Sequence, residues 1–192
     1  GATTSAEKTR AWEQIAATRQ FREARQLEGD GVRILTRWYY SAIRELAARP
    51  DFSRDPAWIA DTVKPRIPVE QAEEALQTLL SVGLLVEEDG AIRTGEASVV
   101  TPHEVAGLVA HNYHYGMLER AQEAIDAFEP EQRHFVGVTV AIPTALMPRL
   151  KQELNAVQAR LLDLCDSAED DADQVVQINL NCFPLSQPRR SS

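Results

Sequence analysis

Two histidines three residues apart are the side chains best suited to chemistry in this chain of 192 residues. His111 and His114 lie in the run HNYHYGMLER with Tyr115 and Glu119 close by, and their spacing places both imidazoles on one face of a helix. A catalytic zinc usually has three protein ligands and a structural zinc has four. We therefore predict no metal and no cofactor, and we assign His111, His114 and Tyr115 to a candidate effector site. The alternative is that these rings pack at a helix–helix interface with their polar tips hydrogen-bonded.

Catalytic groups of other kinds are not evident in the sequence. It has no GxSxG turn, no cysteine in a glycine-rich turn and no phosphate-binding loop. The acidic run Glu87, Glu88 and Asp89 falls on a predicted hairpin turn, where carboxylates are typically solvated. We predict that the protein is not an enzyme. A metal-dependent enzyme that uses His111 and His114 is kept as an alternative.

The two cysteines predict a reducing compartment. Cys165 and Cys182 lie in apolar segments, form no CxxC pair and are expected to be buried free thiols. The sequence has no run of about 18 apolar residues that would span a membrane, and its start, GATTSAEKTR, lacks the apolar stretch of a signal peptide. A chain that begins with Gly1 is expected to be processed or truncated. We predict a cytoplasmic protein with no membrane partner.

The net charge of -9 is unevenly distributed along the chain. Residues 1–50 carry nine Lys and Arg against six Asp and Glu, whereas residues 51–192 carry eleven against 23. An acidic body repels phosphate at long range. Contacts with nucleic acid are therefore expected from the N-terminal stretch or from a segment outside this sequence.

Residues 36–97 show the element order of a winged helix-turn-helix. Proline and glycine mark the ends of the predicted helices: Pro50 after the first, Asp55-Pro56 at the start of a short one, and Gly83 after a helix over 69–82. Asp89-Gly90 between two short runs of strand-forming residues predicts a tight hairpin, which supplies the wing.

The predicted helix over 69–82 would enter the major groove if this motif read DNA. That helix carries no Lys or Arg and three carboxylates, those of Glu70, Glu73 and Glu74. Carboxylates that face phosphates are unfavourable, so we interpret the winged helix as a protein-contact or dimerisation module. Lys64 and Arg66, just before this helix, are the candidate contacts to a DNA backbone.

Residues 101–187 are predicted as helix, strand, helix, strand. Alternating apolar residues predict strands over 135–142 and 176–182. A long helix is expected over 102–129, before the first strand, and a second helix over 150–165, before the second strand. Two strands alone are marginal in water, so we expect them to pair across a dimer or onto another sheet, and we predict a homodimer. The residues assigned to self-association are Trp12, Phe21, Val138, Val140, Ile178 and Leu180.

The predicted fold is α+β and mostly helical, a winged helix-turn-helix followed by the helix-strand-helix-strand unit. We expect an N-terminal helix (5–28) and connector over 1–35, a winged helix-like domain over 36–100, an α+β regulatory and dimerisation domain over 101–187, and a disordered tail over 188–192.

Five runs together resemble an uncharacterised bacterial family over about residues 30–187; they are WYYSAIREL, DPAWIADTVKPRI, EEALQTLLSVGLL, HNYHYGMLERAQEAI and QVVQINLNCFPLS. Members of that family join an N-terminal helix-turn-helix to a C-terminal domain of unknown function and are regarded as transcriptional regulators. The resemblance implies transcription regulation, with DNA recognised by an N-terminal module outside this sequence. His114 and the FPLS run match the family pattern, and no catalytic residue is carried over.

We therefore expect the regulatory and dimerisation region of a cytoplasmic transcriptional regulator. The alternative is an acidic winged-helix module that docks a basic protein partner.

Overall fold

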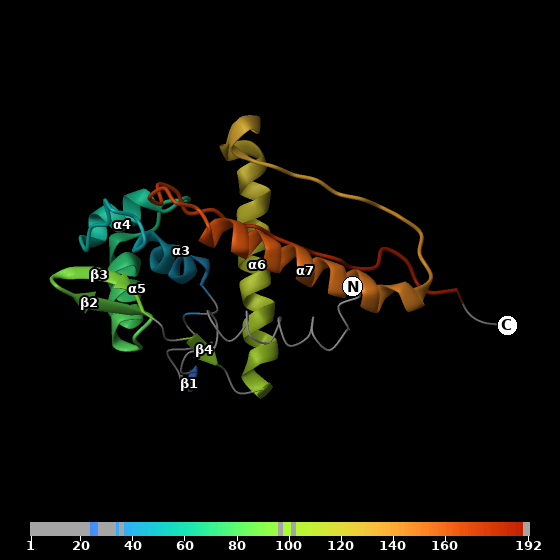
Figure 1. The fold of residues 1–192 in the computed structure, drawn as a ribbon, viewed down its shortest axis with the longest axis horizontal. Coiled ribbons are helices and arrows are strands. Elements are labelled where there is room, and N and C mark those ends of the chain that lie inside the picture. The colour runs from blue at the N-terminus through green and yellow to red at the C-terminus, as the bar shows by residue number, and fades with distance from the viewer. Residues whose placement is uncertain (1–23, 27–33, 35–36, 96–97, 101–102, 190–192) are drawn as a thin grey trace, which may run out of the picture. The chain divides into compact units, whose positions relative to one another are not determined.

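The computed structural model describes residues 24–26, 34, 37–95, 98–100 and 103–189 (Figure 1). Within this part the fold is mixed α+β and mostly helical, as the sequence predicts. The chain divides into two compact units, which are residues 1–120 with 172–175 (unit 1) and residues 121–171 with 176–192 (unit 2). The contact residues Trp12 and Phe21, most of the predicted helix over 5–28 and the last residues of the predicted tail lie outside the described residues.

Three helices and a hairpin follow one another in unit 1 in the predicted order: α3 (Trp38–Leu46), α4 (Pro56–Thr62), α5 (Val69–Ser81), β2 (Leu85–Glu88) and β3 (Ala91–Thr94). The start of α4 is set by Asp55, whose Oδ1 accepts a hydrogen bond of 3.0 Å from the backbone N–H of Ala57. Pro56 occupies the first helical position, where its missing N–H costs no helical hydrogen bond. The predicted cap of this short helix is confirmed.

Gly83 ends α5 with a positive φ of 75°, a conformation that glycine adopts without steric cost. The N–H of Gly83 donates to the carbonyl of Leu80 at 3.1 Å, and the N–H of Leu84 donates to the carbonyl of Leu79 at 3.0 Å. These two bonds form a Schellman motif, which satisfies carbonyls that a helix end otherwise leaves unpaired. The chain thereby turns directly from α5 into β2.

The β2–β3 hairpin closes through a two-residue turn. Asp89 has a φ of 52° and Gly90 a φ of 78°, and Glu88 pairs with Ala91 across the antiparallel strands. Two positive φ values define the turn type that matches the right-handed twist of a hairpin. The Asp-Gly pair therefore sets the register of the hairpin, and this prediction is confirmed.

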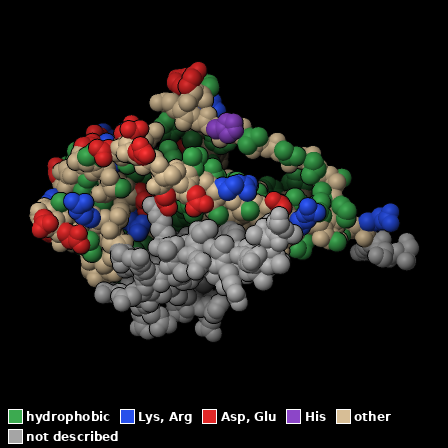
Figure 2. Space-filling model, viewed as in Figure 1, with side chains coloured by type: hydrophobic (Ala, Val, Ile, Leu, Met, Phe, Trp, Pro, Cys, Tyr) green, Lys and Arg blue, Asp and Glu red, His purple; other side chains and the backbone are tan. Residues whose placement is uncertain are grey.

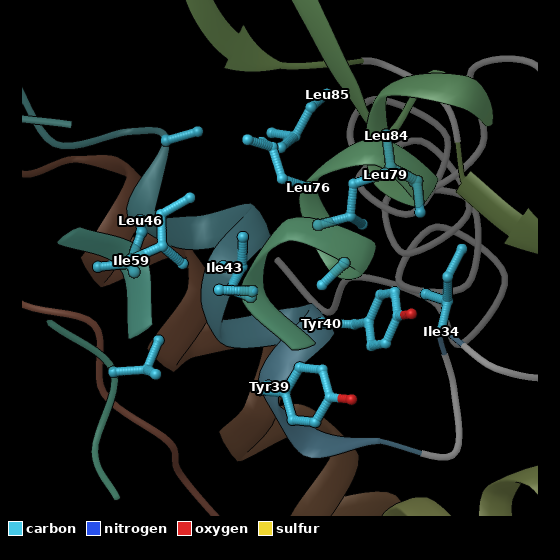
Figure 3. Packing of buried hydrophobic residues seen from close by; sticks show 14 of the residues in the cluster. Ile34, Tyr39, Tyr40, Ile43, Leu46, Ile59, Leu76, Leu79, Leu84 and Leu85 are labelled. Atoms are coloured by element: carbon cyan, nitrogen blue, oxygen red, sulfur yellow. The ribbon is translucent and has the colours of Figure 1, made fainter. Parts of the chain in front are cut away.

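The core of unit 1 joins α3, α4, α5 and the hairpin (Figure 3). Its largest fully buried side chains are Tyr40, Ile43, Ile59, Leu79 and Leu85. The rings of Tyr39 and Tyr40 stack with centroids 5.2 Å apart at the start of α3. Because residues from all of these elements share one core, α5 and the hairpin are held in a defined geometry.

A short parallel pair of strands joins β1 (Ala24–Gln26) to β4 (Ser98–Val100). Residues 24–26 fall within the helix predicted over 5–28, so that prediction is wrong at its C-terminal end. Helix propensity is a weak local preference, and here pairing with a segment more than 70 residues away overrides it. The long helix α6 (His103–Ala127) is present where the sequence predicts it.

Unit 2 continues from the end of α6 through two short 3₁₀ turns, η1 (Pro130–Gln132) and η2 (Thr144–Leu146), into α7 (Met147–Asp166). Residues 133–143 and 171–184 contain no helix or strand, so the two strands predicted in this half are not formed within the described chain. The physical reason is that a strand requires a hydrogen-bonded neighbour, and neither segment has one there.

The prediction that Cys165 and Cys182 are buried is wrong, since both thiols are exposed. None of the described residues of unit 2 is buried, so an apolar sequence context does not by itself place a side chain in a core. None of the described helices combines the length and apolar character required to cross a membrane.

Candidate interaction surfaces

The candidate effector residues lie on the exposed face of α6. The ring of His111 meets that of Tyr115 edge to face, with centroids 4.7 Å apart, and Tyr115 is 59% exposed. His114 is also exposed and contacts the ring of Tyr113 at a centroid distance of 5.7 Å. The structure therefore brings His111 and Tyr115 together, on a surface that solvent reaches rather than at a packed helix interface.

The opposite face of α6 packs against the start of α3. Met117 is buried, and a Cβ on Gly116 would lie 3.8 Å from Cβ of Trp38. The guanidinium of Arg120 lies over the ring of Trp38, 5.3 Å from its centroid, which is cation–π geometry. Because this face is anchored, the position of His111 and its neighbours on the exposed face is fixed.

The start of α3 carries a second cation beside its aromatic rings. Arg37 donates a hydrogen bond of 3.1 Å from Nη1 to the hydroxyl of Tyr39, and this bond raises the pKa of Arg37 above its ordinary value. The guanidinium stays charged in any case, so the bond serves to orient it.

A metal centre would require more ligands than this face supplies. Among the residues that the structure describes, no three His, Cys, Asp or Glu side chains gather closely enough to hold a metal ion. His111 and His114 are thus a pair of imidazoles without a third protein ligand in the described chain, and catalytic zinc sites usually have three.

Acidic side chains are exposed on α5 and at the hairpin turn. Figure 2 shows acidic side chains at the surface in the part of the view where Figure 1 places the hairpin. We call this set the acidic surface: Glu70, Glu73, Glu74, Glu87, Glu88 and Asp89, all exposed. The helix buries its other side through apolar residues such as Ala72, Leu76 and Leu79, which leaves the glutamates facing solvent. Residues 54–94, which contain α4, α5 and the hairpin, carry four Lys and Arg against eight Asp and Glu.

The two candidate contacts to a DNA backbone are both engaged with Asp61. Lys64 donates from Nζ to the carbonyl oxygen of Asp61 at 3.1 Å, and Nη2 of Arg66 lies 2.7 Å from its Oδ1. A third cation, Arg54, lies 3.3 Å from Oε1 of Glu87 on the hairpin. Exposed ion pairs are weak, but each of these places an anion or a carbonyl beside a cation that phosphate would otherwise attract.

Two segments, which belong to unit 2 apart from Gln174 and Val175, expose apolar side chains in the absence of any charge. We call residues 135–142 the first extended segment and residues 174–184 the second. Neither contains Asp, Glu, Lys or Arg, in a chain of which 26% of the residues are charged. The exposed apolar side chains are Phe135, Val136, Val138, Val140, Val176, Ile178, Leu180 and Phe183. Four of them are the residues that the sequence assigns to self-association; the absence of charge over both runs is the signal that also identifies the others.

The chain matches the family of the domain of unknown function DUF4423 over residues 18–185, and it therefore belongs to that family. The match covers both units. No curated protein and no solved structure matches the chain significantly.

Proposed function

We propose that this chain is the regulatory and dimerisation region of a cytoplasmic transcriptional regulator, in which a helix-turn-helix module N-terminal to this sequence recognises DNA. The observation that carries the proposal is the acidic surface on α5 and the hairpin. The elements α3, α4, α5 and the β2–β3 hairpin follow the order of a winged helix. A regulator that retains this architecture without a basic reading helix uses it to contact protein.

The charge of α5 opposes the role that this helix has in a DNA-reading winged helix. The second helix of such a motif lies in the major groove between two rows of phosphates. Duplex DNA carries one negative charge about every 1.7 Å along its axis, and binding depends on Lys and Arg that neutralise it. In α5 the side chains that would approach phosphates include three glutamates, and no cation lies on the helix.

Fluorescence anisotropy of a labelled duplex, with light scattering on the same sample, tests this proposal. We expect a dimeric mass and no salt-sensitive binding at low or moderate salt. The variant Glu70→Gln/Glu73→Gln/Glu74→Gln serves as the matched comparison, because it removes three charges from exposed positions without touching the core. Binding of the wild-type chain that weakens steeply as salt rises would overturn the interpretation of the acidic surface.

The acidic surface also favours a second function, docking of a basic protein segment. Complementary charge speeds the encounter of the two proteins, and this electrostatic attraction weakens as the ionic strength rises. A labelled lysine-rich peptide should then bind the wild-type chain at low salt and lose affinity for the triple Gln variant. Equal affinity for both chains would contradict docking at this surface.

The exposed face of α6 that carries His111, His114 and Tyr115 is the place at which we propose that an effector binds. Since His114 is exposed, the change His114→Ala should alter the response of the intact regulator to its effector without lowering the thermal midpoint of this chain. An equal loss of response and of folding would count against an effector site there.

A further inference from the structure

We propose that the two extended segments form an intermolecular β-sheet with the same segments of a second copy of this chain. The inference deepens the dimerisation part of the proposed function and rests on that part alone. It names the surface that dimerises and the secondary structure that forms there.

Both segments carry the side-chain alternation of half-buried strands. In the first, Val136, Val138 and Val140 fall on one side of an extended chain, and in the second, Ile178 and Leu180 do. The intervening positions of the second segment are Gln177, Asn179 and Asn181, so its two sides differ sharply in polarity. Such alternation is typical of strands that bury one side against other residues and expose the other side to water.

The edges of these segments lack the features that prevent strands from pairing. Exposed edges in monomeric proteins are typically blunted by charged side chains, above all Lys, or by proline. Within residues 135–142 there is neither a charge nor a proline, and within 174–184 the single proline, Pro184, stands at the end. No charged side chain within either segment, and no proline before Pro184, therefore opposes pairing with a neighbouring strand.

Each extended segment is held near one end by a contact within unit 2. Nε of Arg133 donates a hydrogen bond of 2.9 Å to the carbonyl of Phe128, which holds the start of the first segment to the end of α6. In the second segment, Sγ of Cys182 lies 3.7 Å from Sδ of Met147 at the start of α7. These contacts position the segments, while Val136 and Val138 stay about four-fifths exposed at 81% and 80%. Figure 1 shows the first segment as an open span between η1 and η2.

Unit 2 requires a partner because its described residues form no core of their own. Of residues 121–171 and 176–189, none is buried, although the exposed Leu162 and Leu164 of α7 add to the apolar surface. A sheet of two strands is marginal in water, and three or more strands with a hydrophobic face, or packing against a helix, are required for independent stability. Two strands from each of two copies make four, and a two-fold axis supplies the antiparallel arrangement.

The exposed apolar area agrees with what a stable dimer requires. The six exposed apolar side chains on the alternating apolar sides of the two segments range from 38% to 81% in exposed fraction; they are Val136, Val138, Val140, Val176, Ile178 and Leu180. With on the order of 100 Å² of apolar surface on each side chain, they present on the order of 400 Å² per chain. A standard interface buries about 800 Å² per partner, of which about 56–65% is apolar, or on the order of 500 Å². A second copy supplies this surface, already matched in length and in polarity.

Light scattering on paired variants tests whether this surface dimerises the chain. At micromolar concentration the wild-type chain should have twice its mass of 21.4 kDa. Val138→Lys and Leu180→Lys should each raise the dimer dissociation constant at least about 100-fold, because the two-fold axis places two lysines in the apolar interface. The controls Thr139→Lys and Asn181→Lys, one residue away on the opposite side of each segment, should stay dimeric. All four side chains are exposed in the single chain, so none of these changes threatens its folding.

Amide hydrogen exchange on the same samples then identifies the sheet. Residues 135–142 and 174–184 should be protected in the wild-type dimer and exchange freely in the Val138→Lys monomer. A dimer with both segments unprotected would overturn the sheet and leave the dimerisation itself standing. A wild-type monomer, with the segments protected or not, would overturn both. Salt-sensitive DNA binding by a dimer with protected segments would overturn only the proposed role of the acidic surface.

Discussion

Gly95, at the end of the β2–β3 hairpin, is the residue at which the structure makes its sharpest prediction about stability. A Cβ built on Gly95 would lie 2.1 Å from the carbonyl oxygen of Gly83 and 3.3 Å from Cγ1 of Val86. The first of these neighbours is backbone and cannot rotate away. The N–H of Gly95 also donates to the carbonyl of Leu84 at 2.9 Å, and its own carbonyl accepts from Nη2 of Arg44 at 3.3 Å.

The cost of Gly95→Ala follows from these contacts. To reach an ordinary separation the chain must move by more than about 1 Å, which overpacking studies place at about 1–3 kcal/mol. A shift of that size also weakens the hydrogen bond to Leu84, worth about 0.5–1.5 kcal/mol net. We therefore expect Gly95→Ala to lower the free energy of unfolding by about 2–4 kcal/mol.

Urea unfolding followed by tryptophan fluorescence measures this change, because Trp38 and Trp58 pack against the core of unit 1. The control is Gly90→Ala at the hairpin turn, where an added Cβ has no atom within 4 Å but φ is +78°. Gly90→Ala should lower the free energy of unfolding by only about 1–2 kcal/mol, the cost of placing an alanine at a positive φ. If Gly95→Ala were no less stable than Gly90→Ala, the close approach of Gly95 to Gly83 would be refuted.

Two further changes test local interactions in unit 1. Asp55→Ala removes the side-chain cap of α4 and should cost about 1 kcal/mol, seen as a lower urea midpoint; an unchanged midpoint would show that the cap contributes nothing. Hydrogen bonds from Arg49 lower the pKa of the Asp51 carboxyl below its ordinary value of 3.8. The ion pair therefore stabilises the folded chain fully above pH 3.8, and this stabilisation is lost as the pH falls through the lowered pKa. The difference in thermal midpoint between the wild-type chain and Asp51→Asn should accordingly be present near neutral pH and disappear in strong acid; a difference that persists there would contradict the pairing.

Local features of unit 1 could be predicted from the sequence because each depends on a few adjacent residues. Asp55-Pro56 begins a helix through its own side chain and ring, Gly83 ends one through its positive φ, and Asp89-Gly90 closes a hairpin. The exposure of the glutamates on α5 follows from the period of its apolar residues, so the acidic surface could also be predicted.

Features that depend on distant partners were decided by the tertiary structure. Residues 24–26 have a helical pattern but pair with residues 98–100, and α6 carries His111 on the face turned away from Trp38, which no local pattern specifies. The extended segments show the limit most clearly: their alternation predicts strands and their apolar character predicts a buried Cys182, yet within one chain no strand forms and the thiol is exposed. Alternation determines which side of a strand is to be covered, whereas the covering itself requires a neighbour that the sequence of the strand does not contain.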